Sequence, residues 1–220
     1  MNGSDCVLKL LIFDLDGTLI DSLRDLAEAA NYALRAYKLP EHDIEKFRYF
    51  VGDGIPKLIE RILPEDMHSD DMINKVKSVF DSYYSEHYAD YTAPYNNIPE
   101  LLRELKCKGY KLAVASNKPD NFTHDLVDSI FEGMFDVVQG KVDSFEKKPA
   151  PQIIYKISED LGIPLSEAIM IGDTNVDIFT AKNAGIKSIG CLWGFRTKSE
   201  LEEAGADFIV SDPIEILKYI

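Results

Sequence analysis

Short apolar runs alternate with amphipathic helical patterns over the chain from about residue 95 onward. A short apolar run that is bounded by turn residues is typical of a buried strand. The runs that fit this description, of which the first lies near the N-terminus, are Val7–Phe13, Lys111–Ala115, Asp136–Val138, Ala168–Ile171, Lys187–Leu192 and Asp207–Val210. Strands that alternate with helices form a parallel sheet covered by helices on both faces, so we predict an α/β fold.

The segment from residue 20 to residue 89 breaks this alternation, because it holds successive helical patterns and no convincing strand. Ser22 precedes a stripe of apolar residues and Asp25 stands three residues later, which together predict a capped helix. A second stripe, from Ile73 to His87, predicts a long helix that returns toward the core. We therefore expect a core domain of residues 1–19 and 90–220 and an inserted helical domain of residues 20–89.

The charge balance is strongly acidic, since 38 Asp and Glu residues oppose 24 Lys and Arg residues and give a formal net charge of −14. Nucleic acid polymers and anionic membranes bind clustered basic surface, so this balance argues against both as partners. The longest apolar runs, such as Leu10–Phe13, are shorter than the ~18 residues of a membrane span, and no signal peptide is apparent. We expect a cytoplasmic protein that is a monomer or a homodimer.

Reactive groups stand next to four of the predicted strands, in the order Asp14-Leu15-Asp16-Gly17-Thr18, Ser116-Asn117, Lys147-Lys148-Pro149, and Gly172-Asp173 with Asp177 one helical turn later. Each motif alone has an ordinary explanation as a turn, a helix cap or a solvated lysine. Parallel α/β sheets bind ligands beyond the carboxyl ends of their strands, and all four motifs are predicted to lie at those ends. We therefore expect the motifs to converge in one polar pocket.

Three carboxylates in one pocket repel one another, and a Mg²⁺ ion would relieve that repulsion. Magnesium takes about six oxygen ligands, usually with only one or two protein carboxylates, so Asp14 and Asp173 are the predicted direct ligands. The Lys148 ammonium and the Ser116 hydroxyl would hold phosphate oxygens, which is the outline of a phosphoryl-transfer site. Asp14 is predicted to attack phosphorus as the nucleophile, and Asp16 to act as general acid and base.

These motifs resemble those of the haloacid dehalogenase (HAD) superfamily, in its phosphoglycolate phosphatase-like branch, over nearly the whole chain. The resemblance implies a Rossmann-like core with a small α-helical cap that closes over the site and selects the substrate. It implies the nucleophile role for Asp14, and for Asp16 both the acid-base role and a backbone-carbonyl contact to Mg²⁺. It implies that Asp173 binds the metal and that Asp177 supports it. The predicted phosphate-binding residues are Thr18, Ser116, Asn117 and Lys148.

The resemblance also implies a reaction, the Mg²⁺-dependent hydrolysis of a small phosphorylated metabolite through an aspartyl phosphate, with 2-phosphoglycolate as the preferred substrate. Asp16 argues against cleavage of carbon–halogen bonds, because a halide leaving group needs no proton. Several alternatives stay open. Nucleoside monophosphates, pyrophosphate or pyridoxal phosphate are alternative substrates. A β-phosphoglucomutase-like sugar phosphate mutase and a non-catalytic module phosphorylated on Asp14 are alternative functions.

One segment of the insertion resembles the substrate-facing cap loop of that branch. Its candidate substrate-binding residues are Gly52, Asp53, Gly54 and Lys57. An ordinary helix–helix turn explains the same residues equally well. A surface charge is the simpler interpretation of each cation that would otherwise meet a substrate carboxylate, namely Arg24, Lys57, Arg61 and Lys118. We interpret Trp193-Gly194-Phe195, which follows the fifth predicted strand, as a packing segment.

Overall fold

The computed structural model describes residues 8–220, so Val7 of the predicted first strand lies outside the described residues. The chain divides into two compact units. We call the first the core unit, which comprises the described residues up to Leu19 together with Pro94–Ile220. The second, Ile20–Ala93, is the helical unit.

The core unit holds a parallel sheet of six strands in the order β5-β4-β1-β6-β7-β8. Its strands are β1 (Leu10–Phe13), β4 (Lys111–Pro119), β5 (Val137–Lys141), β6 (Ala168–Gly172), β7 (Lys187–Cys191) and β8 (Phe208–Val210). The predicted parallel α/β fold is thereby confirmed. The strand order reverses at β1, which lies between β4 and β6, and this reversal is where such sheets bind their ligands.

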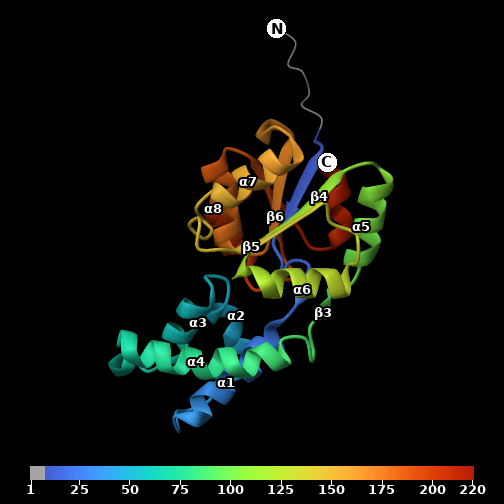
Figure 1. Ribbon diagram of the computed structural model, residues 1–220. Helices are drawn as coiled ribbons and strands as arrows, with labels where there is room; N and C mark the ends of the chain where they lie inside the picture. Colours follow the sequence, from blue (N-terminus) through green and yellow to red (C-terminus); the bar gives the residue numbers. More distant parts are fainter. Residues whose placement is uncertain (1–7) are drawn as a thin grey trace. The chain divides into compact units, whose positions relative to one another are not determined.

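Helices cover both faces of this sheet (Figure 1), with α7 and α8 on the left and α5 on the right. The helices of the core unit are α5 (Ile98–Cys107), α6 (Asp120–Ile130), α7 (Gln152–Leu161), α8 (Asn175–Ala184) and α9 (Lys198–Ala204), with short 3₁₀ helices at Leu165–Glu167 and Pro213–Lys218. Ile154 and Ile157 of α7 pack against Ile12 and Met170 of the sheet. Each such side chain contributes roughly 1.5–3 kcal/mol through its burial.

Strand β4 is longer than the sequence predicts. We expected it to end at Ala115, but it continues to Pro119, and its pairing with β5 shifts register between Ala115 and Pro119. Ser116-Asn117 therefore lies in the irregular last part of the strand rather than after it. Such irregularities redirect side chains at the rim of a sheet, and here the affected residues are those of the second motif.

The helical unit is built on α1 (Leu23–Ala36) and α4 (Asp70–His87), which pack against each other. Leu26 and Leu34 of α1 and Val76 and Phe80 of α4 are buried, as their helical spacing predicts. The remaining elements are α2 (Phe47–Phe50), α3 (Ile55–Ile62), 3₁₀ helices at Ile44–Lys46 and Glu65–Met67, and the short paired strands β2 (Ile20–Asp21) and β3 (Ala93–Pro94).

The start of α1 differs from the prediction. Ser22 is the N-cap residue, but its side chain makes no capping hydrogen bond, and the Leu23 amide donates to Asp21 Oδ1 instead (3.2 Å). Asp25 is buried and accepts hydrogen bonds from the amides of Tyr91 (3.1 Å) and Thr92 (2.8 Å) and from the Thr92 hydroxyl (2.6 Å). This carboxylate ties residues 91 and 92 to α1, so the helical unit extends to Ala93 rather than to residue 89.

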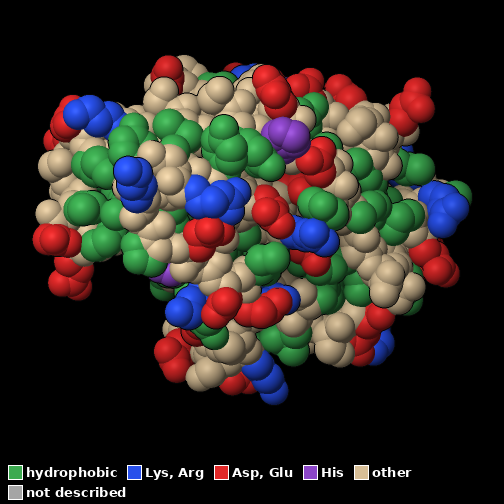
Figure 2. Space-filling view, turned by 90° about the horizontal axis from the view of Figure 1, so that it is seen from below, with side chains coloured by type: hydrophobic (Ala, Val, Ile, Leu, Met, Phe, Trp, Pro, Cys, Tyr) green, Lys and Arg blue, Asp and Glu red, His purple; other side chains and the backbone are tan. Residues whose placement is uncertain are grey.

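Opposite charges are mixed on the surface. The exposed ion pairs of the helices include Lys75 with Asp71 (2.6 Å), and Figure 2 shows acidic and basic side chains interspersed over one face. Among the described residues, we find no helix whose length and apolar character would let it cross a membrane.

Candidate active site

Asp14 and Asp16 lie in the tight turn that follows β1. The Asp14 amide donates to the Ile171 carbonyl of β6 (2.9 Å), which holds the start of the turn at the carboxyl end of the sheet. Gly17 has a φ of 89°, in the left-handed region that favours glycine, and a Cβ at this position would clash with the Asp173 carboxylate. Glycine at position 17 is therefore what lets the turn pass so close to Asp173.

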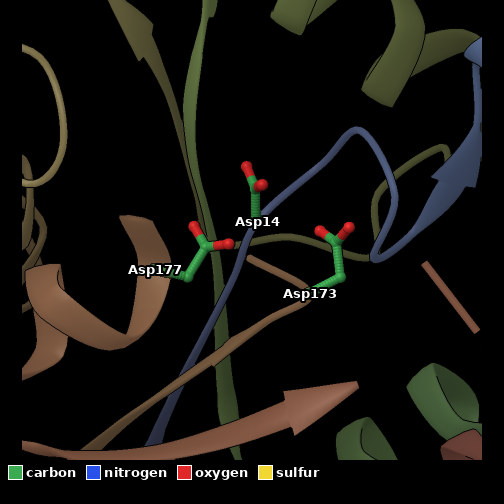
Figure 3. Close-up of side chains that lie close together, drawn as sticks. All are labelled: Asp14, Asp173 and Asp177. Atoms are coloured by element: carbon green, nitrogen blue, oxygen red, sulfur yellow. The ribbon is translucent and has the colours of Figure 1, made fainter. Parts of the chain in front are cut away.

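Three buried carboxylates meet beyond β1 and β6 (Figure 3). Asp173 directly follows β6 and Asp177 lies in the first turn of α8, and one carboxylate oxygen each of Asp14, Asp173 and Asp177 lie within 4.8 Å of one another. Asp177 also closes the N-terminus of α8, because its Oδ2 accepts from the Thr174 amide (3.1 Å) and hydroxyl (2.7 Å). The cap fixes the side chain that borders the cluster.

Lys148 is buried against this acidic cluster. Its ammonium lies 2.8 Å from Asp14 Oδ1, 2.7 Å from Asp177 Oδ1 and 2.8 Å from the Ala115 carbonyl oxygen. An ammonium has three N–H donors, so these three acceptors occupy all of them. Burial alone would lower the pKa of Lys148, but the Asp14 and Asp177 carboxylates raise it above its ordinary value, so the lysine is charged.

Two carboxyls of the cluster, those of Asp14 and Asp173, have raised pKa values. Burial and the neighbouring Asp177 raise the pKa of Asp14 to about 7, against the opposing effect of Lys148. Burial, with Asp177 and Asp14, raises the pKa of Asp173 well above its ordinary value. One lysine among three carboxylates leaves 1 − 3 = −2 charges if all ionise. A divalent cation has the charge and the oxygen preference that would balance them.

Two predicted phosphate-binding side chains have other partners. The Thr18 hydroxyl donates to Asp173 Oδ1 (3.0 Å), so Thr18 orients a carboxylate of the cluster. The Asn117 amide donates to the Lys148 carbonyl (3.1 Å) and accepts from the Lys148 amide (2.8 Å). This two-way pairing fixes the loop that carries Lys148. Ser116 is buried, and its hydroxyl accepts from the Lys118 amide (3.1 Å).

The segment Trp193-Gly194-Phe195 supports the cluster, which the sequence did not reveal. The Phe195 amide donates to Asp173 Oδ2 (2.8 Å), and the Trp193 indole donates to the Thr18 carbonyl (2.9 Å). A Cβ at Gly194 would clash with Asp173 and with the Gly17 carbonyl. The packing interpretation of this segment was therefore incomplete, and its position after β7 was the only available signal of a role in the site.

Lys118 is not the surface charge that we expected. It is 6% exposed, and its ammonium donates to both carboxylate oxygens of Asp16 (3.1 and 3.3 Å). Asp16 itself keeps 19% of its side chain exposed, whereas Asp14 is buried in the cluster. The two aspartates of the first motif thus have different partners, since Lys148 contacts Asp14 and Lys118 contacts Asp16.

The candidate loop of the helical unit connects α2 to α3. Gly52 and Gly54 have φ values of 110° and 85°, and Gly54 is the N-cap residue of α3. Arg61 bridges the loop, because it contacts Asp53 Oδ2 (2.6 Å) and donates to the Phe50 carbonyl (3.0 Å). Lys57 pairs with Glu60 on the same helix (2.6 Å). The loop is ordered by its own contacts, and these are compatible with both of its sequence interpretations.

Comparison with known proteins shows the family of the chain. Residues 11–191 match the family model described as haloacid dehalogenase-like hydrolase. The chain belongs to the haloacid dehalogenase-like hydrolase family. The resemblance of the chain to the HAD superfamily is thereby confirmed.

Several HAD relatives match over nearly their whole length. The phosphoglycolate phosphatase of Aquifex aeolicus (strain VF5) is 36% identical over 212 residues, which cover 96% of each chain. The phosphoglycolate phosphatase of Vibrio parahaemolyticus is 35% identical, covering 97% of this chain and 96% of its own. A crystal structure from Lactobacillus delbrueckii subsp. bulgaricus superposes with a TM-score of 0.94 at 32% identity, over 97% of this chain and 98% of the other. The predicted HAD-family phosphatase is confirmed as the class of this enzyme.

A divalent metal fits the acidic cluster. HAD phosphatases use such an ion, and the buried set of Asp14, Asp173 and Asp177 supplies oxygen ligands with an excess of negative charge. The pKa values of Asp14 and Asp173 are raised because both carboxylates are buried beside other negative charges. A bound cation would reduce that repulsion. The donor chemistry and the charge of the site therefore agree with the family's use of a metal.

Proposed function

We propose that this enzyme is a Mg²⁺-dependent phosphatase that hydrolyses 2-phosphoglycolate through a phosphorylated Asp14. The observation that carries the proposal is the buried cluster of Asp14, Asp173, Asp177 and Lys148. Asp16 of the same motif pairs with a different lysine, Lys118. Asp14, Asp173 and the Asp16 carbonyl would hold the Mg²⁺ ion, with Asp177 beside them, and the bound ion would offset the charge of the phosphoryl group.

The first half of the reaction forms the aspartyl phosphate. An Asp14 carboxylate oxygen attacks phosphorus, the bond from phosphorus to the ester oxygen breaks, and protonated Asp16 gives its proton to that oxygen. Lys148, at 2.8 Å from Asp14, holds the nucleophile in place. The three N–H donors of Lys148 are occupied within the cluster, so Lys148 acts on the phosphoryl group through its charge. The Ser116 hydroxyl is the proposed hydrogen-bonding partner of a phosphoryl oxygen.

The second half returns the enzyme to its starting state. Asp16, now ionised, takes a proton from a water molecule while the water oxygen attacks phosphorus. The bond between phosphorus and Asp14 breaks, inorganic phosphate leaves, and Asp16 is again protonated. Thr18 and the Phe195 amide hold Asp173, and Asn117 holds the Lys148 loop, so these residues position the reacting groups through both steps.

The substrate assignment rests on the relatives. Two enzymes of this length that are 35–36% identical to the chain are phosphoglycolate phosphatases, which supports a small phosphorylated acid as substrate. We propose that the helical unit, Ile20–Ala93, serves as the cap that selects the substrate, with Gly52–Lys57 as its substrate loop. We further propose that the enzyme acts in the cytoplasm as a monomer or a homodimer.

Phosphate release from a panel of phosphorylated metabolites tests the proposal. Wild-type enzyme should prefer 2-phosphoglycolate, require Mg²⁺ and lose turnover in chelator. Asp14→Asn should lower kcat by about 10⁴-fold or more, because it removes the nucleophile of the first step. Asp160→Asn is the matched control, since Asp160 is an exposed aspartate of α7 that pairs with Lys156; its kcat should equal that of wild type.

Other outcomes would redirect the assignment. If a nucleoside monophosphate, pyrophosphate or pyridoxal phosphate is hydrolysed faster than 2-phosphoglycolate, the proposed mechanism stands and the substrate assignment is wrong. Conversion of β-glucose 1-phosphate to glucose 6-phosphate would indicate a mutase. Stable phosphorylation without turnover would indicate a phospho-aspartate binding module.

A further inference from the structure

Lys118 lies in the site but has no role in the proposed reaction. It lies in the last, irregular part of β4, buried, with its ammonium against both oxygens of Asp16. Its main chain is held on both sides: its amide donates to the Ser116 hydroxyl (3.1 Å), and its carbonyl accepts from the Thr123 hydroxyl (3.3 Å). The position of this buried cation is therefore fixed by the core unit itself.

The contact with Asp16 places Lys118 close to one particular part of any substrate. In the proposed reaction, Asp16 gives its proton to the ester oxygen, so the ester oxygen lies within hydrogen-bonding distance of Asp16. The ammonium is 3.1 Å from the same carboxylate. A group on the carbon next to the ester oxygen therefore comes within reach of Lys118.

In 2-phosphoglycolate that group is a carboxylate, which begins two bonds from the ester oxygen, within about 4 Å of it. The carboxylate needs a cation of its own, because the protein carries a net charge of −14 and the donors of Lys148 are occupied by Asp14, Asp177 and Ala115. We propose that Lys118 binds the substrate carboxylate and is a specificity-determining residue of the core unit for 2-phosphoacids.

This role rests on the proposed function, and it differs from a role in which Lys118 only orients Asp16. A residue that orients the general acid serves every phosphate ester alike. A residue that binds the carboxylate serves only substrates that carry one, because an ammonium–carboxylate hydrogen bond forms with no other substrate group at that place. The ratio of kcat/KM for an acid substrate to that for its uncharged analogue separates the two roles.

The test uses 2-phosphoglycolate and ethyl phosphate, which has a methyl group in place of the carboxylate. Both are measured with wild type, Lys118→Met and Lys111→Met. Lys111 is the matched control, because it lies at the opposite end of β4, pairs with Asp136 and carries the same charge. Lys118→Met should lower the ratio of the two kcat/KM values by about 100-fold, chiefly through KM for 2-phosphoglycolate, whereas Lys111→Met should leave it unchanged.

A ratio that stays at its wild-type value in Lys118→Met overturns the inference, however much both activities fall. A wild-type ratio near one contradicts the proposed substrate class instead, so the two failures are distinct. If Lys118→Met does not fold, Lys118→Gln gives the same test, because its amide keeps a donor for Asp16 and lacks the charge; its ratio should fall as well, and an unchanged ratio overturns the inference.

Discussion

Charged side chains are treated differently in the core unit and in the helical unit. In the core site, Asp14, Asp177 and Lys148 are buried, and each has partners from separate elements of the same unit. In the loop of the helical unit, the Asp53–Arg61 pair keeps 27% and 28% of its side chains exposed. Water screens the second kind of pair and not the first.

This difference indicates which charged residues tolerate substitution and which do not. Removing one partner from a buried charge cluster leaves the others without compensation, so the core site has little tolerance for change. A partly exposed pair contributes little to stability, so Asp53 and Arg61 can vary without loss of the fold. We therefore attribute the chemistry to the core cluster, and we expect the loop of the helical unit to adjust substrate preference in addition to the proposed carboxylate contact of Lys118.

The largest effect should come from Lys148→Met. This variant leaves three buried carboxylates without their ammonium, which should lower the free energy of unfolding by about 3–5 kcal/mol in chelator. Lys57→Met, which removes an exposed lysine of the helical unit, should leave it unchanged within error. Urea denaturation of the three proteins measures both. Equal stability of Lys148→Met and wild type would contradict the contrast between the two units.

A smaller effect should follow the metal. At 100 times its Kd, Mg²⁺ should raise the melting temperature of wild type by roughly 5–10 °C, because it binds the folded cluster and not the unfolded chain. Asp173→Asn should lose most of this shift, since it removes a proposed ligand. Asp53→Asn, in the helical unit, should keep it. Thermal unfolding with Mg²⁺ and with chelator measures the shift in melting temperature. A shift in Asp173→Asn equal to that of wild type would exclude Asp173 as a ligand.

The smallest effect concerns the loop between α2 and α3. Asp53→Asn breaks the contact with Arg61 and should cost less than about 1 kcal/mol of stability. If the loop meets the substrate, as we propose, KM for 2-phosphoglycolate should rise by roughly 3- to 10-fold while kcat stays the same. Glu45→Gln, which breaks an exposed pair with Arg48, is the control. An unchanged KM in Asp53→Asn would show an ordinary helix–helix turn.

The sequence predicts the parts of the fold whose signals are local. Gly162 and Gly185 follow α7 and α8 with φ values of 64° and 73°, the left-handed conformation with which glycine commonly ends a helix. The carboxylates of the site were predicted because each stands at or near the end of an apolar run, and parallel strands bring such ends together. A single chain segment carries each of these signals.

The parts that the sequence missed depend on distant partners. Lys118 meets Asp16 across 102 residues, and the Trp193 indole meets the Thr18 carbonyl across 175. Asn117 pairs with the main chain of Lys148 across 31 residues, so its side chain has a structural task that its motif does not reveal. Periodicity and spacing report neighbours along the chain, and none of these contacts is of that kind.

The central claim is that Asp14 becomes phosphorylated, and trapping that phosphate tests it most directly. Asp16→Asn should slow the water attack, and p-nitrophenyl phosphate should still phosphorylate the variant, because its leaving group needs no proton from Asp16. Acid quenching during turnover, followed by peptide mass spectrometry, should find one phosphoryl group on the peptide that holds Asp14. An unmodified Asp14 peptide while the phenol is being released, or a phosphoryl group on another residue, would contradict the account.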